Sequence, residues 1–134
     1  MVKIEVVYQG DKHTQITHEP SGAVLETDAP KDNNGRGESF SPTDLVASAL
    51  GSCILTTMAI LGEKDGIDIR GAKCQVIKNM AAAPRRISNL TVNIEMPPSI
   101  AVDRREKLEG FARGCPVVKS LAESLEIPIS FSWL

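Results

Sequence analysis

The chain has 134 residues, of which 42% are hydrophobic and 24% are charged. This length suits one domain over 1–134, and the composition is that of a folded globular protein rather than a disordered one. Lys and Arg number 15 and Asp and Glu number 17, so the net charge is −2, and aromatic residues make up 4%. The composition therefore argues against a nucleic-acid partner and against attachment to an anionic membrane, because both need a basic surface.

The N-terminal third is predicted to form short strands. Apolar Val2, Ile4 and Val6 alternate with charged neighbours, a period of two that is typical of a strand. Glu5 interrupts this apolar run, so we expect no export signal, a cytoplasmic location and three cysteines that are free thiols. Two further strands are expected over 14–18 and 23–27, and a loop over 29–39.

Ser41 marks the sharpest boundary in the sequence. It fits the N-cap of a helix, Pro42 fits the first helical position, and Asp44 can complete a capping box. No charged residue occurs from Leu45 to Gly62, so we expect a long central helix that is buried nearly all round. This stretch reaches the lower limit for a membrane span, but its four hydroxyl side chains favour a buried helix of a soluble protein.

The second half of the chain alternates strands and helices. Strands are expected over 67–80, 86–96 and 127–133, a hairpin loop over 81–84, and helices over 103–113 and 116–124. This order favours an α+β fold in which a mainly antiparallel sheet is wrapped around the central helix.

Cys53 and Cys115 are the candidate chemical groups. Cys53 lies in the middle of the central helix, where an unpaired cysteine is most often a small core residue, and its reactivity would need a nearby cation. Cys115 precedes Pro116 at a helix start, where a helix dipole favours the thiolate, although it could equally pack beneath the preceding helix. Spacing alone does not decide whether the two thiols meet. Cys74 is interpreted as a structural or incidental residue.

Arg36 lies in the loop ahead of the central helix and is the only arginine before Cys53. It is either a solvated loop residue or a guanidinium that folds over a thiolate and orients a peroxide through paired hydrogen bonds. The two histidines and the scattered cysteines match no metal-ligand motif, and no phosphate-binding loop is present. We therefore expect neither a metal nor a cofactor.

Two segments carry a resemblance to a known family. Phe40-Ser-Pro-Thr-Asp-Leu-Val-Ala-Ser-Ala-Leu-Gly-Ser-Cys53 and Cys115-Pro-Val-Val-Lys-Ser-Leu121 resemble the OsmC/Ohr family of osmotically inducible and organic hydroperoxide resistance proteins, in its OsmC-like branch. The resemblance implies an intertwined homodimer with active sites at the subunit interface. It also implies a stress-response peroxidase in which Cys53 reacts with an organic hydroperoxide. Its sulfenic acid then condenses with the resolving Cys115, and an external dithiol resets the disulfide.

The sequence departs from the family pattern at two positions. Thr43 stands where the family has its catalytic glutamate, and the first hairpin offers Lys12 and His13 where the family has an arginine. Arg36 is the candidate to replace that arginine. Two alternative functions stay open at this point: a non-catalytic protein that binds a small apolar ligand at the dimer interface, and a redox sensor.

Overall fold

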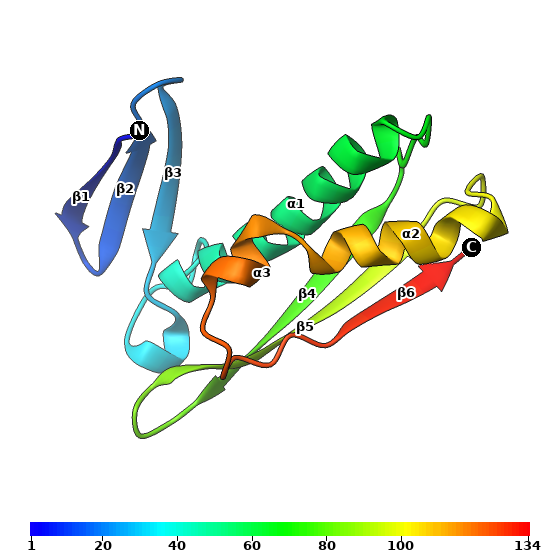
Figure 1. Cartoon of the computed structure of the whole chain (residues 1–134). Helices are drawn as coiled ribbons and strands as arrows, with labels where there is room; N and C mark the ends of the chain where they lie inside the picture. Colours follow the sequence, from blue (N-terminus) through cyan, green and yellow to red (C-terminus); the bar gives the residue numbers. More distant parts are fainter. The chain divides into compact units, whose positions relative to one another are not determined.

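The computed structural model describes residues 1–134. The chain divides into two compact units, Met1–Val46 and Ala47–Leu134, which are described in turn (Figure 1). The expectation of one domain over 1–134 stays a prediction.

The first unit is built on a three-stranded antiparallel sheet in the order β1-β2-β3 (Figure 1). Its strands are β1 (Ile4–Gly10), β2 (His13–His18) and β3 (Ala23–Asp28). The β1–β2 turn places Asp11 and Lys12 at positive φ, the conformation that matches a tight turn to the twist of a hairpin. The three predicted strands are confirmed, and the predicted loop contains one 3₁₀ turn, Lys31–Asn33.

One face of this sheet carries an open apolar surface. Val6 pairs with Ile16, which pairs with Leu25, so three apolar side chains form a row across the strands. Ile4 and Tyr8 extend this row along β1, because alternate residues of a strand share a face. Val6 is 59% exposed and Leu25 is 55% exposed. A small sheet normally covers such a face, since a sheet needs apolar packing to be stable.

The second unit is a sheet covered by helices on one face. Its strands are β4 (Lys73–Ala81), β5 (Arg86–Met96) and β6 (Ile129–Trp133), in the order β4-β5-β6. Figure 1 shows α1 (Pro42–Glu63), α2 (Val102–Arg113) and α3 (Pro116–Ser120) on the same side of this sheet. The predicted α+β fold is therefore confirmed.

The strand pairs of this sheet differ in direction. β4 and β5 are antiparallel, as a hairpin requires, whereas β5 and β6 are parallel. α2 and α3 form the crossover that returns the chain to the starting end of β5, and a parallel pair needs such a connection. The sheets are thus mainly antiparallel, as expected, with one parallel pair made by the helical connection.

α1 begins where the sequence predicts it to begin. The Asp44 N–H donates to Ser41 Oγ (3.1 Å), and the Ser41 N–H donates to Asp44 Oδ2 (2.9 Å). This reciprocal pair is the predicted capping box, and it satisfies two backbone donors at the helix start.

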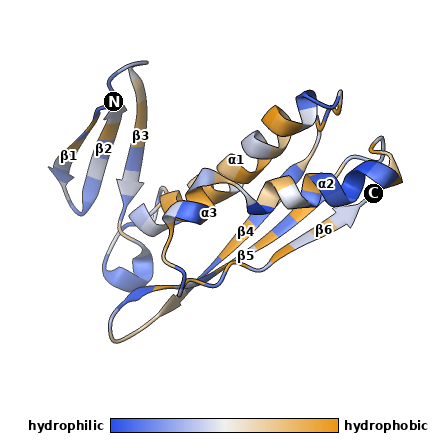
Figure 2. Ribbon diagram, viewed as in Figure 1, coloured by the Kyte–Doolittle hydropathy of each residue, from blue (hydrophilic) through white to orange (hydrophobic).

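The buried face of α1 forms part of the core of the second unit. Six of its 22 residues are buried: Ala47, Leu50, Gly51, Ile54, Met58 and Gly62. The other face is exposed in the single chain, where Ile60 is 55% exposed, and Figure 2 shows apolar colour along much of the helix. By length and composition α1 could cross a membrane, but one of its faces packs inside this unit. The outer face of α1 is therefore an apolar surface that solvent reaches in the single chain.

The segment predicted as the start of a strand, 67–72, is irregular instead. Gly66 and Gly71 adopt positive φ, and the Ala72 N–H donates to the Ile69 carbonyl in a turn. The Asp68 carboxylate accepts the Arg70 N–H at 2.9 Å. This side chain offers the backbone a local partner that competes with strand pairing, so β4 begins only at Lys73.

Two predicted boundaries near the C-terminus were also wrong. α3 ends at Ser120 rather than Ser124, and the Ser120 hydroxyl donates to the Pro116 carbonyl (2.8 Å) in its last turn. β6 begins at Ile129 rather than Ile127, because Pro128 has no N–H to give to the sheet.

Candidate redox site

Cys53 lies on a flank of α1 and is partly buried. Its Sγ is 3.9 Å from Oγ1 of Thr57, one helical turn further along. Residues four apart share a helix face, so the two side chains point to the same side. Ile54 and Met58 face the core, and Cys53 is rotated away from Ile54 by about 100°. The helix therefore places this sulfur beside the core rather than inside it.

Cys115 is the N-cap residue of α3 and is fully buried. The Val118 N–H donates to its Sγ at 3.4 Å, and Pro116 occupies the first turn of the helix. The sequence prediction that Cys115 caps a helix is confirmed. The thiol thus has a fixed position and a backbone donor directed at its sulfur.

Cys53 and Cys115 are close enough within the second unit for their thiols to interact. Burial raises the pKa of the Cys115 thiol, the Val118 N–H lowers it, and a hydrogen bond with Cys53 and the charge of that neighbour raise it further. The net direction is upward, so Cys115 favours its neutral thiol. α1 supplies one thiol and the α2–α3 connection supplies the other. The structure thus brings the two candidate thiols close to each other, one partly exposed and the other buried.

Cys74 lies apart from this pair. Its Sγ would be 3.3 Å from a Cβ added at Gly51, so β4 and α1 approach closely at this point. Gly51 and Cys53 are two residues apart on α1 and therefore point about 200° apart around the helix. Burial alone raises the pKa of the Cys74 thiol. These surroundings agree with its interpretation as a packing residue.

Arg36 belongs to the first unit, where it binds Asp28. Its Nη2 atom is 3.2 Å from Asp28 Oδ1, and His13 Nδ1 is 2.7 Å from the same oxygen. Asp28 is 2% exposed. The bond from His13 lowers the pKa of the Asp28 carboxyl, Arg36 lowers it further, and burial opposes both. The same bond raises the pKa of His13. An activating role for Arg36 stays a prediction.

Sequence reasoning missed this trio of Asp28, His13 and Arg36. A signal was available, because His13 and Asp28 are opposite each other in the β2–β3 ladder. This pairing can be predicted only when the register of that hairpin is known, because the register decides which side chains are neighbours.

The family glutamate position is occupied by a residue of the helix start. Thr43 Oγ1 is 3.2 Å from Ser41 Oγ, and the adjacent Asp44 accepts the Ser41 N–H in the capping box. Both side chains are thus engaged in ending the loop and starting α1. No group of three or more His, Cys, Asp or Glu side chains lies close enough to hold a metal ion.

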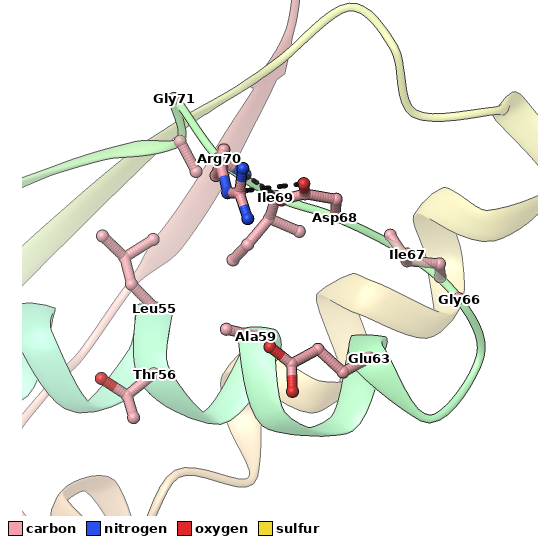
Figure 3. Close-up of a pocket in the computed structure, with 11 residues that line it drawn as sticks. Leu55, Thr56, Ala59, Glu63, Gly66, Ile67, Asp68, Ile69, Arg70 and Gly71 are labelled. Carbon is pink, nitrogen blue, oxygen red and sulfur yellow. Dashed lines mark hydrogen bonds and ion pairs between the residues drawn. The ribbon is translucent and has the colours of Figure 1, made fainter.

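A cleft of about 570 Å³ lies along the other flank of α1. Leu55 and Ala59 form one wall, and the irregular segment 66–72 forms the other (Figure 3). Figure 3 also shows Arg70 paired with Asp68, with 3.6 Å between Nε and Oδ2. None of the three cysteines lines this cleft. The sulfur pair and the cleft are therefore separate features of the second unit.

A family model and several solved structures are similar to this chain. The family model described as OsmC-like protein matches residues 35–130. No curated protein matches the chain. A solved structure from Psychrobacter arcticus 273-4, named for osmotic stress induction and a detoxification response, is 39% identical. The match covers 98% of this chain and 96% of that one, with a TM-score of 0.93.

Two further solved structures carry organic hydroperoxide resistance in their names. The protein from Legionella pneumophila is 16% identical, with a TM-score of 0.76 and coverage of 98% of this chain and 96% of that one. The protein from Bacillus subtilis is 13% identical, with a TM-score of 0.71 and coverage of 98% of both chains. At these identities the likeness shows a shared fold. The match over residues 35–130 and the 39% identity show the family itself, and the chain belongs to the OsmC-like family.

Proposed function

We propose that this protein is a cysteine-based peroxidase that reduces organic hydroperoxides to alcohols. The observation that carries the proposal is the meeting of Cys53 and Cys115, which α1 and α3 bring together from distant parts of the chain. Membership of a family with hydroperoxide resistance proteins among its structural neighbours supports it.

The proposed reaction oxidises the sulfur pair and reduces the peroxide by two electrons. The Cys53 thiolate attacks the terminal hydroperoxide oxygen, so that an S–O bond forms as the O–O bond breaks. The alkoxide leaves and takes a proton from water, which gives the alcohol and a Cys53 sulfenic acid. Cys115, as its thiolate, then attacks the sulfenic sulfur, hydroxide leaves and is protonated to water, and the Cys53–Cys115 disulfide forms. An external dithiol reduces this disulfide.

The surroundings of the two sulfurs support this division of roles. Cys53 is partly exposed, whereas Cys115 is fully buried, so Cys53 is the sulfur that a peroxide can reach. Leu45 to Gly62 contains no charged residue, and such an apolar neighbourhood favours an organic peroxide over a small polar one. The resting pair must be a dithiol, which suits a reducing compartment such as the cytoplasm.

We also propose that the protein works as an intertwined homodimer. Two apolar surfaces of the single chain have no cover: the Val6–Ile16–Leu25 face of the first sheet and the outer face of α1 with Ile60. Burial of such faces against a second copy is the usual solution in symmetric assemblies. In this proposal Arg36 acts as the activating guanidinium at the Cys53 thiolate, held by Asp28.

The test is the intact mass of the fully reduced protein after one equivalent of cumene hydroperoxide, followed by peptide mapping. We expect the loss of two hydrogens and a peptide pair that joins Cys53 to Cys115. Cys115→Ser should instead gain one oxygen at Cys53, because the sulfenic acid then lacks its partner. Serine is the better replacement here, since it also caps a helix and keeps the start of α3 intact. Cys74→Ser is the matched control and should form the disulfide.

Three free thiols after peroxide treatment would refute the proposed reaction. Ligand binding that survives Cys53→Ser would then favour the non-catalytic alternative. Disulfide formation without repeated turnover in the presence of a dithiol would favour the redox sensor.

A further inference from the structure

Thr57 is the side chain whose contact with Cys53 the peroxidase proposal has not used. Its Oγ1 is 3.9 Å from Cys53 Sγ, within reach of a hydrogen bond to sulfur. Both residues are partly buried, so water competes less for this bond than it would at an open surface. The spacing of four residues makes the contact a property of the helix itself, because it needs no other element to align the pair.

α1 gives Cys53 no other obvious source of positive potential. Cys53 is eleven residues after Pro42, the first residue of α1, or roughly 16 Å along the axis, and the helix dipole fades within the first turn. No Lys or Arg occurs from Leu45 to Gly62. Cys115 differs, because the Val118 N–H at the start of α3 donates to its sulfur. Within α1 only a side-chain donor can stabilise a Cys53 thiolate, in addition to the Arg36 guanidinium proposed above, and the Thr57 hydroxyl lies within hydrogen-bonding distance of the sulfur.

We propose that Thr57 is a further catalytic residue whose hydroxyl donates a hydrogen bond to the Cys53 thiolate and holds it ready for attack. A thiolate can only accept, so the hydroxyl must be the donor in this state. A threonine in a helix has a second rotamer that bonds the carbonyl four residues earlier, here that of Cys53 itself. The hydroxyl can thus turn to that carbonyl when the sulfur is oxidised or bound to Cys115. This inference rests on the proposed peroxidase function.

The test compares three variants by a readout that needs no peroxide. Thr57→Val keeps the shape and removes the hydroxyl, Thr57→Ser keeps the hydroxyl, and Thr56→Val is the matched control on the neighbouring, exposed position. Alkylation of Cys53 by iodoacetamide is followed at about pH 7 and at about pH 10 by mass spectrometry of its peptide. A second assay follows the rate of Cys53 oxidation by cumene hydroperoxide.

Thr57→Val should slow alkylation at pH 7 by about threefold, because loss of the bond lowers the thiolate fraction while the freed sulfur is a stronger nucleophile. The rates at pH 10 should be equal or slightly higher, and both Thr57→Ser and Thr56→Val should behave like the unsubstituted protein. A structural disturbance would not follow this pH pattern. Peroxide oxidation should slow by a similar factor.

Equal alkylation of Thr57→Val and the unsubstituted protein at pH 7 would overturn the role of Thr57, whatever the peroxide assay gives. The proposed function fails separately, by the absence of a Cys53–Cys115 disulfide in the unsubstituted protein. A slower alkylation in Thr57→Val together with that absence would mean that Thr57 activates the thiol for a reaction other than peroxide reduction.

Discussion

Cys53 and Cys115 show how the position of a cysteine along a helix changes the exposure and the hydrogen-bond partners of its thiol. Cys115 is the N-cap residue of α3 and is buried. Burial raises the pKa of its thiol, which favours the neutral form. Cys53 lies in mid-helix with Thr57 one turn away, and it is open enough to meet a reagent. In the proposed reaction the peroxidatic residue must be reachable and the resolving residue must be held in place until the first has reacted, and these two environments suit those proposed roles.

The His13–Asp28 pair should make stability depend on pH. The pKa of His13 is raised above 6.5, so its contribution is complete below that pH and is lost as pH rises through the folded-state pKa. The pKa of Asp28 is lowered below 3.8, so its contribution is present above that pH and is lost in stronger acid. We therefore expect His13→Gln to destabilise the protein more at about pH 6 than at about pH 9.

Urea unfolding at one fixed protein concentration measures this difference. In an Asp28→Asn background the substitution of His13 should lose most of its pH-dependent effect, because only the weaker, more exposed partner Glu26 then remains, with its Oε1 3.6 Å from His13 Nε2. An equal effect of His13→Gln at both pH values would show that this ion pair does not contribute.

Gly51 should resist substitution because β4 passes close to it. An added Cβ would lie 3.0 Å from Val76 Cγ2 and 3.3 Å from Cys74 Sγ. Overpacking of this kind costs about 1–3 kcal/mol, whereas alanine gains about 0.5–1 kcal/mol over glycine in a helix. We expect Gly51→Ala to lower the free energy of unfolding. Gly110→Ala is the control: it lies in α2 with nothing within 4 Å, and it should gain about 0.5–1 kcal/mol. Equal gains at both positions would contradict the close packing.

Among the elements, α1 and α3 begin with side-chain caps of different strength. α1 has the reciprocal bonds between Ser41 and Asp44, and α3 has the single sulfur cap of Cys115. The α1 cap fixes the residue at which the loop ends and the helix begins. It thereby fixes the direction around the helix axis in which Cys53 and the core residues point. The five-residue α3 has little helix beyond its cap, so that cap mainly holds the Cys115 sulfur in place.

Ser41→Ala should destabilise the protein by about 1 kcal/mol through the loss of the cap. Ser41→Asp should retain most of the stability, since aspartate is also a preferred N-cap residue. Thermal or urea unfolding compares the three proteins. A cost in Ser41→Asp as large as in Ser41→Ala would show that the hydroxyl acts through something other than capping.

At the scale of the whole molecule, the open apolar faces are the main departure from an ordinary monomer. The outer face of α1 and one face of the first sheet are both apolar and both lack cover in the single chain. Apolar surface buried from water contributes about 25 cal/mol per Å², so a second copy that covers these faces would supply much of the stability of the assembly. The proposed homodimer is therefore also a proposal about why the chain folds.

Val6→Glu should weaken the dimer, because it puts a charge on the apolar face that we propose to be covered. Val7→Glu is the matched control, since adjacent strand residues point to opposite faces. Light scattering after gel filtration should give the dimer mass for the unsubstituted protein and for Val7→Glu, and a shift toward the monomer for Val6→Glu. A monomer mass for the unsubstituted protein would refute the homodimer.

Local features could be predicted from the sequence because their physical causes lie within a few residues. The Ser41–Asp44 capping box, the Cys115-Pro116 helix start and the 86–96 strand each depend on neighbours in the chain, and each was predicted where it occurs. The segment 67–72 was predicted as the start of the 67–80 strand, whereas it forms a turn in the structure. The Asp68 side chain accepts the Arg70 N–H, and Gly71 adopts a positive φ, so the backbone of this segment makes local hydrogen bonds instead of pairing with a neighbouring strand.

Contacts between residues that are distant in the chain could not be predicted from the sequence. The sequence by itself determined the two thiols, the uncharged helix that carries one of them, and the cap that carries the other. Only packing decided that these thiols meet, that β6 runs parallel to β5, and that His13 and Arg36 share Asp28. The reason is that a cap or a strand period is a short-range interaction, whereas the meeting of two distant side chains depends on sheet register and on the close approach of a helix to a strand, as at Gly51.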